Sequence, residues 1–117
     1  MEQNLSFTTN WNGKLNCSCF TTLRLHNHEK YFAGAVMNII LNGQLKGKAV
    51  IIQVNYFTIE KINEFVARID TGYSATECQK MIKEMYKNNP RINWKTQLLD
   101  FCLLEYQKEA KSPSLFS

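Results

Sequence analysis

The sequence predicts an α+β fold in which a mostly antiparallel sheet or small β-barrel is covered by a packed pair of helices. Three observations support this prediction. The chain before residue 58 is rich in β-branched and aromatic residues and is punctuated by Asn-Gly pairs. Apolar residues then recur at the three- and four-residue steps typical of helices. One further short apolar segment follows, at residues 97–105.

The first half of the chain is expected to form strands. We place them at residues 5–9, 15–25, 36–41 and 48–57. The first two are expected to pair as a hairpin around Asn12-Gly13, because Asn and Gly tolerate the positive φ angles of a two-residue turn. Asn42-Gly43 offers a second turn of the same kind.

Two helices are expected next. The first covers residues 58–68, with Thr58 available as its N-cap. The second begins at Ser74, where Glu77 three positions later completes a capping box. It is expected to end before Pro90, because the residue preceding a proline avoids the helical region.

The last strand and the domain organisation follow from the same pattern. The segment at residues 97–105 contains a short apolar run, residues 98–104, with one charge, Asp100, which we expect at a sheet edge. The length of 117 residues is that of one ordinary domain, expected to span residues 1–117 with its core at about 5–106. The tail from residue 108 to residue 117 is expected to fray.

Composition excludes several classes of protein. The chain is 44% hydrophobic, which is typical of a globular protein rather than a disordered one. No stretch is long and apolar enough for a membrane span, and the first residues lack the blocks of a signal peptide, so we expect a cytoplasmic protein. The net charge of +4 permits binding to phosphates, but Lys and Arg do not form long runs.

No metal or other cofactor is predicted. The four cysteines are Cys17, Cys19, Cys78 and Cys102. The first two are separated by one residue, whereas structural zinc sites usually separate their cysteines by two to four, and no second pair follows. His26 and His28 lie in a polar loop with only Glu29 nearby to complete a metal shell.

The segment at residues 19–24, Cys-Phe-Thr-Thr-Leu-Arg, contains the first candidate site residues. In a regular strand its side chains alternate between two faces. One face carries Phe20, Thr22 and Arg24, and the other carries Cys19, Thr21 and Leu23. Arg24 is then either a solvated side chain or a fork that holds a carboxylate, phosphate or carbonyl group.

The connector between the two helices, residues 70–74, contains the second group. Gly72 permits a sharp bend, and Asp70 either caps the following helix or faces a cleft, where a carboxylate could accept a proton. Rings that could stack on bases are Trp11, Tyr31 and Tyr56, although a solvated sheet face would carry the same residues.

In this order the motifs resemble those of an ASCH domain, a small branch of the PUA-like superfamily. The resemblance runs from about residue 15 to residue 104. It depends on the Thr-x-Arg strand ending at Arg24, on the segments at residues 31–34 and 47–49 that precede strands, and on the helical segment from Asp70 to Tyr86. Each motif is short, and their order and spacing carry the resemblance.

The resemblance implies a compact β-barrel with packed helices and a cleft lined by the Thr-Arg strand. It implies that the cleft binds RNA or a nucleotide, with Thr21, Thr22, Arg24, Asp70 and Tyr73 as ligand-binding residues. Small bacterial members hydrolyse N4-acylated cytidine nucleosides without metal, using a lysine, a threonine and a glutamate. In this chain the threonine corresponds to Thr22, and Asp70 lies near the acid position with a one-residue gap and a shorter side chain.

The lysine position of that set is occupied by Cys19, so the hydrolytic mechanism does not transfer intact. Cys19 is either a buried structural thiol or a nucleophile activated by a nearby cation such as Arg24 or Lys14. Three hypotheses therefore stay open. They are a binding module for RNA or a nucleotide, a hydrolase of acylated nucleosides or a ribonuclease with Thr22, Asp70 and Cys19 as catalytic residues, and a small interaction partner whose cleft is vestigial.

Overall fold

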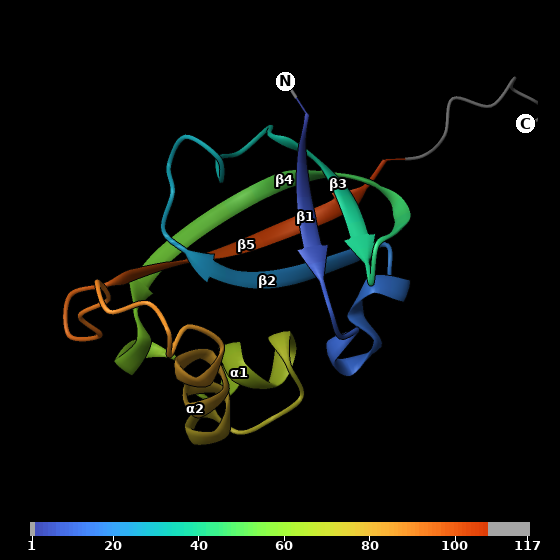
Figure 1. Ribbon diagram of the computed structural model, residues 1–117. Coiled ribbons are helices and arrows are strands. Elements are labelled where there is room, and N and C mark those ends of the chain that lie inside the picture. The colour runs from blue at the N-terminus through green and yellow to red at the C-terminus, as the bar shows by residue number, and fades with distance from the viewer. Residues whose placement is uncertain (1, 108–117) are drawn as a thin grey trace, which may run out of the picture.

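The fold is a curled five-stranded mixed sheet with helices against one side, seen here in a computed structural model that describes residues 2–107 (Figure 1). The strands are β1 (Gln3–Phe7), β2 (Cys19–Leu25), β3 (Val36–Leu41), β4 (Gln44–Thr58) and β5 (Leu98–Tyr106). Their order in the sheet is β1-β3-β4-β5-β2, so the two edge strands face each other across the open side of a half-barrel. The predicted α+β class is confirmed.

The first hairpin of the sequence-based prediction is wrong. β1 pairs in parallel with β3, and a 3₁₀-helical segment, η1 (Trp11–Asn16), carries the chain from β1 to β2. Asn12 and Gly13 do adopt positive φ angles, of 59° and 65°. The left-handed pair therefore makes a bend inside a helical connector rather than a turn between two paired strands.

The hairpin between β3 and β4 is confirmed. Asn42 and Gly43 have φ angles of 51° and 81°, and β3 pairs antiparallel with β4 on either side of them. β5 is also confirmed as a strand, but the prediction that Asp100 lies at a sheet edge is wrong. β5 lies between β4 and β2, and Asp100 is fully buried. The predicted frayed tail, residues 108–117, lies outside the described residues.

The first helix begins later than the sequence predicts. A short 3₁₀ turn, η2 (Ile59–Lys61), follows β4, and the α-helix α1 (Glu64–Asp70) starts only after Asn63, whose side chain accepts a hydrogen bond from the backbone N–H of Val66. Asn63, rather than Thr58, is therefore the N-cap. In α1, Val66, Ala67 and Asp70 are buried, whereas Phe65 and Ile69 are exposed.

The second helix, α2 (Ala75–Met85), begins as predicted. Ser74 and Glu77 form the complete capping box, with the Ser74 side chain accepting from the backbone N–H of Glu77. Cys78 and Ile82 are buried, whereas Met85 at the end of the helix is exposed. Within residues 2–107, no helix has the length and apolar character needed to cross a membrane.

Two apolar cores lie on the two sides of the sheet. The first fills the inside of the half-barrel, where Phe20, Ile51 and Leu104 pack with Leu5 and Phe7. The second joins the sheet to α1 and α2 and contains Leu23, Ile59, Ile62, Val66, Ala67, Cys78, Ile82 and Leu99. β2 contributes to both, which explains why Phe20 through Leu23 are all buried. Side chains from both faces of this strand are therefore close to the junction of sheet and helices.

Candidate functional site

A pocket of about 220 Å³ opens where β1, β2, η1 and the helices meet. Its lining comes from the end of β1 and the residues after it, from β2, and from the connector between the helices together with α2. The polar and charged residues that line it include Lys14, Thr22, Arg24, Asp70 and Thr71. The predicted cleft between sheet and helices thus corresponds to a hollow in the structure.

Lys14 and Asp70 form a buried ion pair at this pocket. The Lys14 Nζ lies 2.9 Å from the Asp70 Oδ1, and both side chains are more than nine-tenths removed from solvent. Burial lowers the pKa of Lys14 from its ordinary value, because the ammonium loses water, while the Asp70 carboxylate opposes that shift. The amine of Lys14 is therefore closer to its neutral form than a surface lysine would be.

Thr21 completes a three-residue cluster on the same carboxylate. Its hydroxyl donates to the Asp70 Oδ1 at 2.9 Å, so this oxygen accepts from both Thr21 and Lys14. The other oxygen, Oδ2, accepts no hydrogen bond from residues 2–107. Among these residues, no side-chain nitrogen or oxygen that is closed to solvent lacks a partner, so Asp70 Oδ2 is within reach of solvent.

Arg24 lies in the pocket lining and is held from three sides. Its Nε donates to the Thr22 hydroxyl at 3.0 Å, and its Nη2 donates to the backbone carbonyl of Ser6 at 3.0 Å. The guanidinium carbon lies 4.5 Å from the centre of the Phe7 ring, within cation–π range. These partners are neutral, so Arg24 is a positioned cation with no carboxylate paired to it among the described residues.

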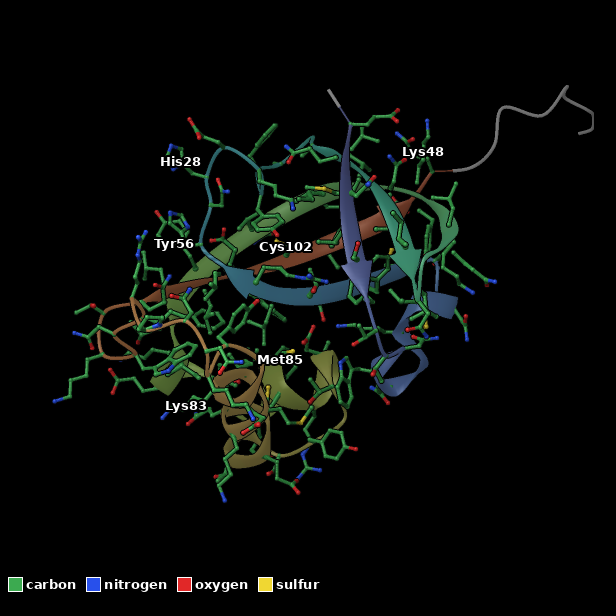
Figure 2. The ribbon with its side chains drawn as sticks, in the orientation of Figure 1. His28, Lys48, Tyr56, Lys83, Met85 and Cys102 are labelled. Atoms are coloured by element: carbon green, nitrogen blue, oxygen red, sulfur yellow. The ribbon has the colours of Figure 1, made fainter. Side chains whose placement is uncertain are left out.

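The remaining pocket wall is apolar and comes mainly from α2. Met81, Ile82 and Met85 line it from the helix, and Trp11 lines it from η1. Figure 2 shows Met85 on the side of α2 that faces the sheet. Methionine side chains adapt to flat or irregular ligands, so this wall suits a planar or aliphatic group.

The structure gathers most, but not all, of the residues proposed from the sequence. Thr22, Arg24 and Asp70 line the same pocket, and Thr21 contacts Asp70. Cys19 and Tyr73 are not among the lining residues. The Tyr73 ring packs edge-on against Trp11, with 5.9 Å between ring centres.

Cys19 is exposed at the start of β2, so the expectation of a buried structural thiol at this position is wrong. Strand alternation places Cys19 on the same face as Thr21, but two residues earlier and at the rim of the sheet. The buried thiol near Asp70 is instead Cys78, whose pKa is raised to about 11, mainly by burial and also by the Asp70 charge.

Lys14 is the site residue that the sequence did not assign. The family resemblance places the hydrolytic lysine at Cys19, and the sequence offers Lys14 only as a cation that could lie near that residue. A lysine directly after Asn12-Gly13 gives little sign of burial, since a turn predicts exposure. The 3₁₀ connector η1, which contacts both β2 and α1, brings it to Asp70. Within residues 2–107 no three His, Cys, Asp or Glu side chains converge as a metal site.

Comparison with known proteins supports the fold. No protein-family model matches the sequence, and no curated protein matches it. The structure is similar to that of an ASCH domain from Lactobacillus crispatus JV V101, with a TM-score of 0.66 and 10% sequence identity over 90% of this chain and 79% of that one. It is also similar to protein EF3133 from Enterococcus faecalis V583, of family DUF984, with a TM-score of 0.59 and 18% identity over 80% of this chain and 66% of that one.

A third similar structure is that of protein PH0355, with a TM-score of 0.61 and 11% identity over 92% of this chain and the whole of that one. At such low sequence identities, the similarity to these structures shows a shared fold only. The chain therefore has an ASCH-like fold, as the order of its sequence motifs predicts.

Proposed function

We propose that the pocket binds a nucleoside or nucleotide, either free or at the end of a single-stranded RNA. The observation that carries this proposal is the convergence of Arg24, Thr22 and Asp70 on one hollow with an apolar wall. A base has a flat apolar face and polar edges, which such a wall and such a set of donors and acceptors would match. The ASCH-like fold supports the same reading by analogy.

The charges of the pocket favour a ligand that carries a negative group. Lys14 and Asp70 neutralise each other, whereas Arg24 has only neutral partners among the described residues. A phosphate or carboxylate would gain charge-assisted hydrogen bonds from the guanidinium without requiring it to move far. Asp70 Oδ2 would accept from an amino group of the base.

The test is a titration of cytidine and cytidine 5′-monophosphate into the protein, followed by calorimetry. We expect Arg24→Ala to weaken binding of the monophosphate by at least about 1 kcal/mol, as for the loss of a charged hydrogen bond. Arg91→Ala, which changes an exposed arginine outside the pocket, is the matched control. Equal affinity of the Arg24→Ala variant and the parent would contradict the proposal.

A second candidate function is hydrolysis of an N-acylated nucleoside in the same pocket. One specific set of contacts favours it. The side chains of Lys14 and Thr21 both donate hydrogen bonds to the carboxylate of Asp70. These three residues correspond to the lysine, the threonine and the glutamate that the family resemblance implies for hydrolysis, with Thr21 and Lys14 in place of Thr22 and Cys19 and an aspartate in place of the glutamate. Burial lowers the pKa of Lys14, so its ammonium gives up a proton more readily than that of a surface lysine.

In this reaction, water adds to the acyl carbon and gives a proton to the Lys14–Asp70 pair. The bond between the acyl carbon and nitrogen then breaks, and the leaving amino group takes that proton. The products are a carboxylic acid and the free amine. Thr21 would keep the carboxylate oriented through its hydrogen bond to Oδ1.

The test is incubation with N4-acetylcytidine and chromatographic measurement of cytidine. We expect Lys14→Met and Asp70→Asn to abolish turnover and Cys19→Ala to leave it unchanged, because Cys19 does not line the pocket. Folding of each variant is checked by circular dichroism. If the parent shows no turnover, or Lys14→Met retains it, the hydrolytic function is wrong while the binding proposal is still tested by the titration above.

A further inference from the structure

A second cluster of polar side chains lies outside the pocket, around the buried Asp100. Asp100 accepts a hydrogen bond on each carboxylate oxygen, from the His26 Nδ1 at 2.7 Å and from the backbone N–H of Asn27 at 2.9 Å. Asp100 is fully buried, whereas about 30% of the His26 side chain is exposed. None of these residues lines the pocket.

The contact to Asp100 favours one tautomer of the neutral His26 ring. A carboxylate that faces Nδ1 favours the proton on that nitrogen, which leaves the lone pair on Nε2. Nε2 has no hydrogen-bond partner among residues 2–107. A carboxylate behind one imidazole nitrogen is the arrangement that orients histidine ligands of metal ions and increases their basicity.

A second imidazole lies beside the first. The ring centres of His26 and His28 are 6.1 Å apart, and the rings are inclined by 31°. Zinc–nitrogen bonds of about 2.0–2.1 Å at a tetrahedral angle hold two bound rings with their centres roughly 5 Å apart. A shift of about 1 Å would bring the two rings to that spacing, and His28 is an exposed loop residue that can rotate.

The Tyr56 ring packs against the His26 ring. Tyr56 is paired with Asp100 across β4 and β5, so both side chains lie on one face of the sheet. The His26 and Tyr56 rings are 5.4 Å apart. Figure 2 shows His28 and Tyr56 together near one end of the sheet, while Met85 lies on the helical side.

We propose that His26 and His28 form a binding site for a late first-row divalent cation such as Zn²⁺ or Ni²⁺, with Asp100 as the positioning residue behind His26. The remaining coordination positions would be taken by water, because the described residues supply no third protein ligand. Imidazole is a ligand that suits these ions. This site is separate from the pocket and takes no part in the proposed functions above.

The experiment titrates Zn²⁺ and Ni²⁺ into the full chain with Cys17 and Cys19 both changed to Ser, because these exposed thiols would also bind zinc. His26 and His28 are the only histidines, so nitrogen-15 NMR of the imidazoles reports on this site alone. We expect saturable binding of one ion, with both sets of imidazole signals shifted. His28→Gln, a change at an exposed position, should lower the affinity at least about tenfold, and Asp100→Asn should lower it about 10- to 100-fold.

Two results would overturn the proposal. One is unchanged imidazole signals at millimolar Zn²⁺ and Ni²⁺ in the parent. The other is a His28→Gln variant that binds both ions as tightly as the parent. If Asp100→Asn fails to fold, His28→Gln and His26→Gln still decide the question, because neither residue belongs to the buried cores.

Discussion

Asp70 and Asp100 are both buried carboxylates, but their two oxygens are used differently. On Asp70 a single oxygen accepts from Lys14 and Thr21, and the other is left to the pocket. On Asp100 each oxygen has its own partner within the chain, in the loop after β2. The first carboxylate therefore keeps bonding capacity for a ligand, whereas the second uses its capacity to position an imidazole and a loop. Burial alone does not distinguish these two roles. They are distinguished by whether a carboxylate oxygen lacks a hydrogen-bond partner within the described residues.

Removal of the Asp70 carboxylate is expected to have the largest effect on stability. Asp70→Ala leaves the Lys14 ammonium buried without a countercharge, which should lower the free energy of unfolding by about 3–5 kcal/mol. Urea denaturation measures this loss. The double variant Lys14→Met/Asp70→Leu should recover most of it, because no charge is then buried. A loss of less than about 1 kcal/mol in Asp70→Ala would show that the pair is not desolvated as described.

A smaller effect is expected from the Asp100 side. Asp100→Ala leaves the His26 ring and the Asn27 N–H without their acceptor, and should cost about 1–3 kcal/mol. The loss is smaller than for Asp70→Ala because both groups lie near the surface, where water can replace the carboxylate. Hydrogen exchange at the Asn27 amide should accelerate in this variant and stay unchanged in Asp70→Ala. Equal exchange rates of the Asn27 amide in the two variants would contradict the conclusion that Asp100, and not Asp70, holds the loop after β2.

The connector that holds Asp70 depends on the cap of α2. Ser74→Ala removes the side-chain acceptor of the capping box and should lower the free energy of unfolding by about 1 kcal/mol. Ser18→Ala, at an exposed position before β2, is the control and should stay within about 0.5 kcal/mol of the parent. A further readout is the pair of histidine NMR signals, which Ser74→Ala should leave in place. If they shift, the two regions are coupled through the sheet.

The smallest effect concerns pH, and it involves one buried thiol near each carboxylate. Burial raises the pKa of Cys78 to about 11 and that of Cys102 to about 12, with contributions from Asp70 and Asp100 respectively. Between the unfolded pKa and these values the folded thiols keep protons that the unfolded chain releases, so stability falls as pH rises. Each thiol should lower the free energy of unfolding by less than about 1 kcal/mol at pH 9 relative to pH 7.

Comparison of each cysteine-to-alanine variant with the parent isolates this contribution. The lowered pKa of Lys14 acts in the opposite direction, since the unfolded chain then holds the extra proton and stability rises with pH. That term is common to the parent and to Cys102→Ala, and therefore cancels. Denaturation curves at pH 7 and pH 9 should show a smaller pH-dependent loss in Cys102→Ala. An identical loss would mean that the thiol ionises equally in both states.

Much of the sheet could be predicted because its signals are local. Asn42-Gly43 between two β-rich segments fixes a hairpin, and the Ser74–Glu77 pair fixes a helix start. The Asn12-Gly13 pair gives the same signal and adopts the predicted positive φ angles, but β1 before it pairs with β3 and not with β2. Whether a strand pairs with its neighbour or with a later strand depends on tertiary packing, here of Leu5 and Phe7 inside the half-barrel.

The candidate site was predictable only where a family motif marked it. Thr22, Arg24 and Asp70 came from the motif and do line one pocket. Lys14 and Asp70 are 56 residues apart, and His26 and Asp100 are 74 apart. Nothing local distinguishes a charged residue that will be buried with a distant partner from one that will face water. The sequence therefore predicts an edge position for Asp100 and gives no indication that Lys14 is buried.

Arg24 lies at the open side of the half-barrel, where a backbone carbonyl of β1 and a bound anion would compete for its N–H donors. β1 is hydrogen-bonded into the sheet along only its β3 side, and across the gap to β2 the guanidinium donates to the Ser6 carbonyl. An anion that recruits the same donors would release that carbonyl. Ligand binding in the pocket and attachment of β1 to the rest of the sheet are then thermodynamically linked. A bound ligand would weaken the attachment of β1, and detachment of β1 would change the affinity of the pocket for its ligand.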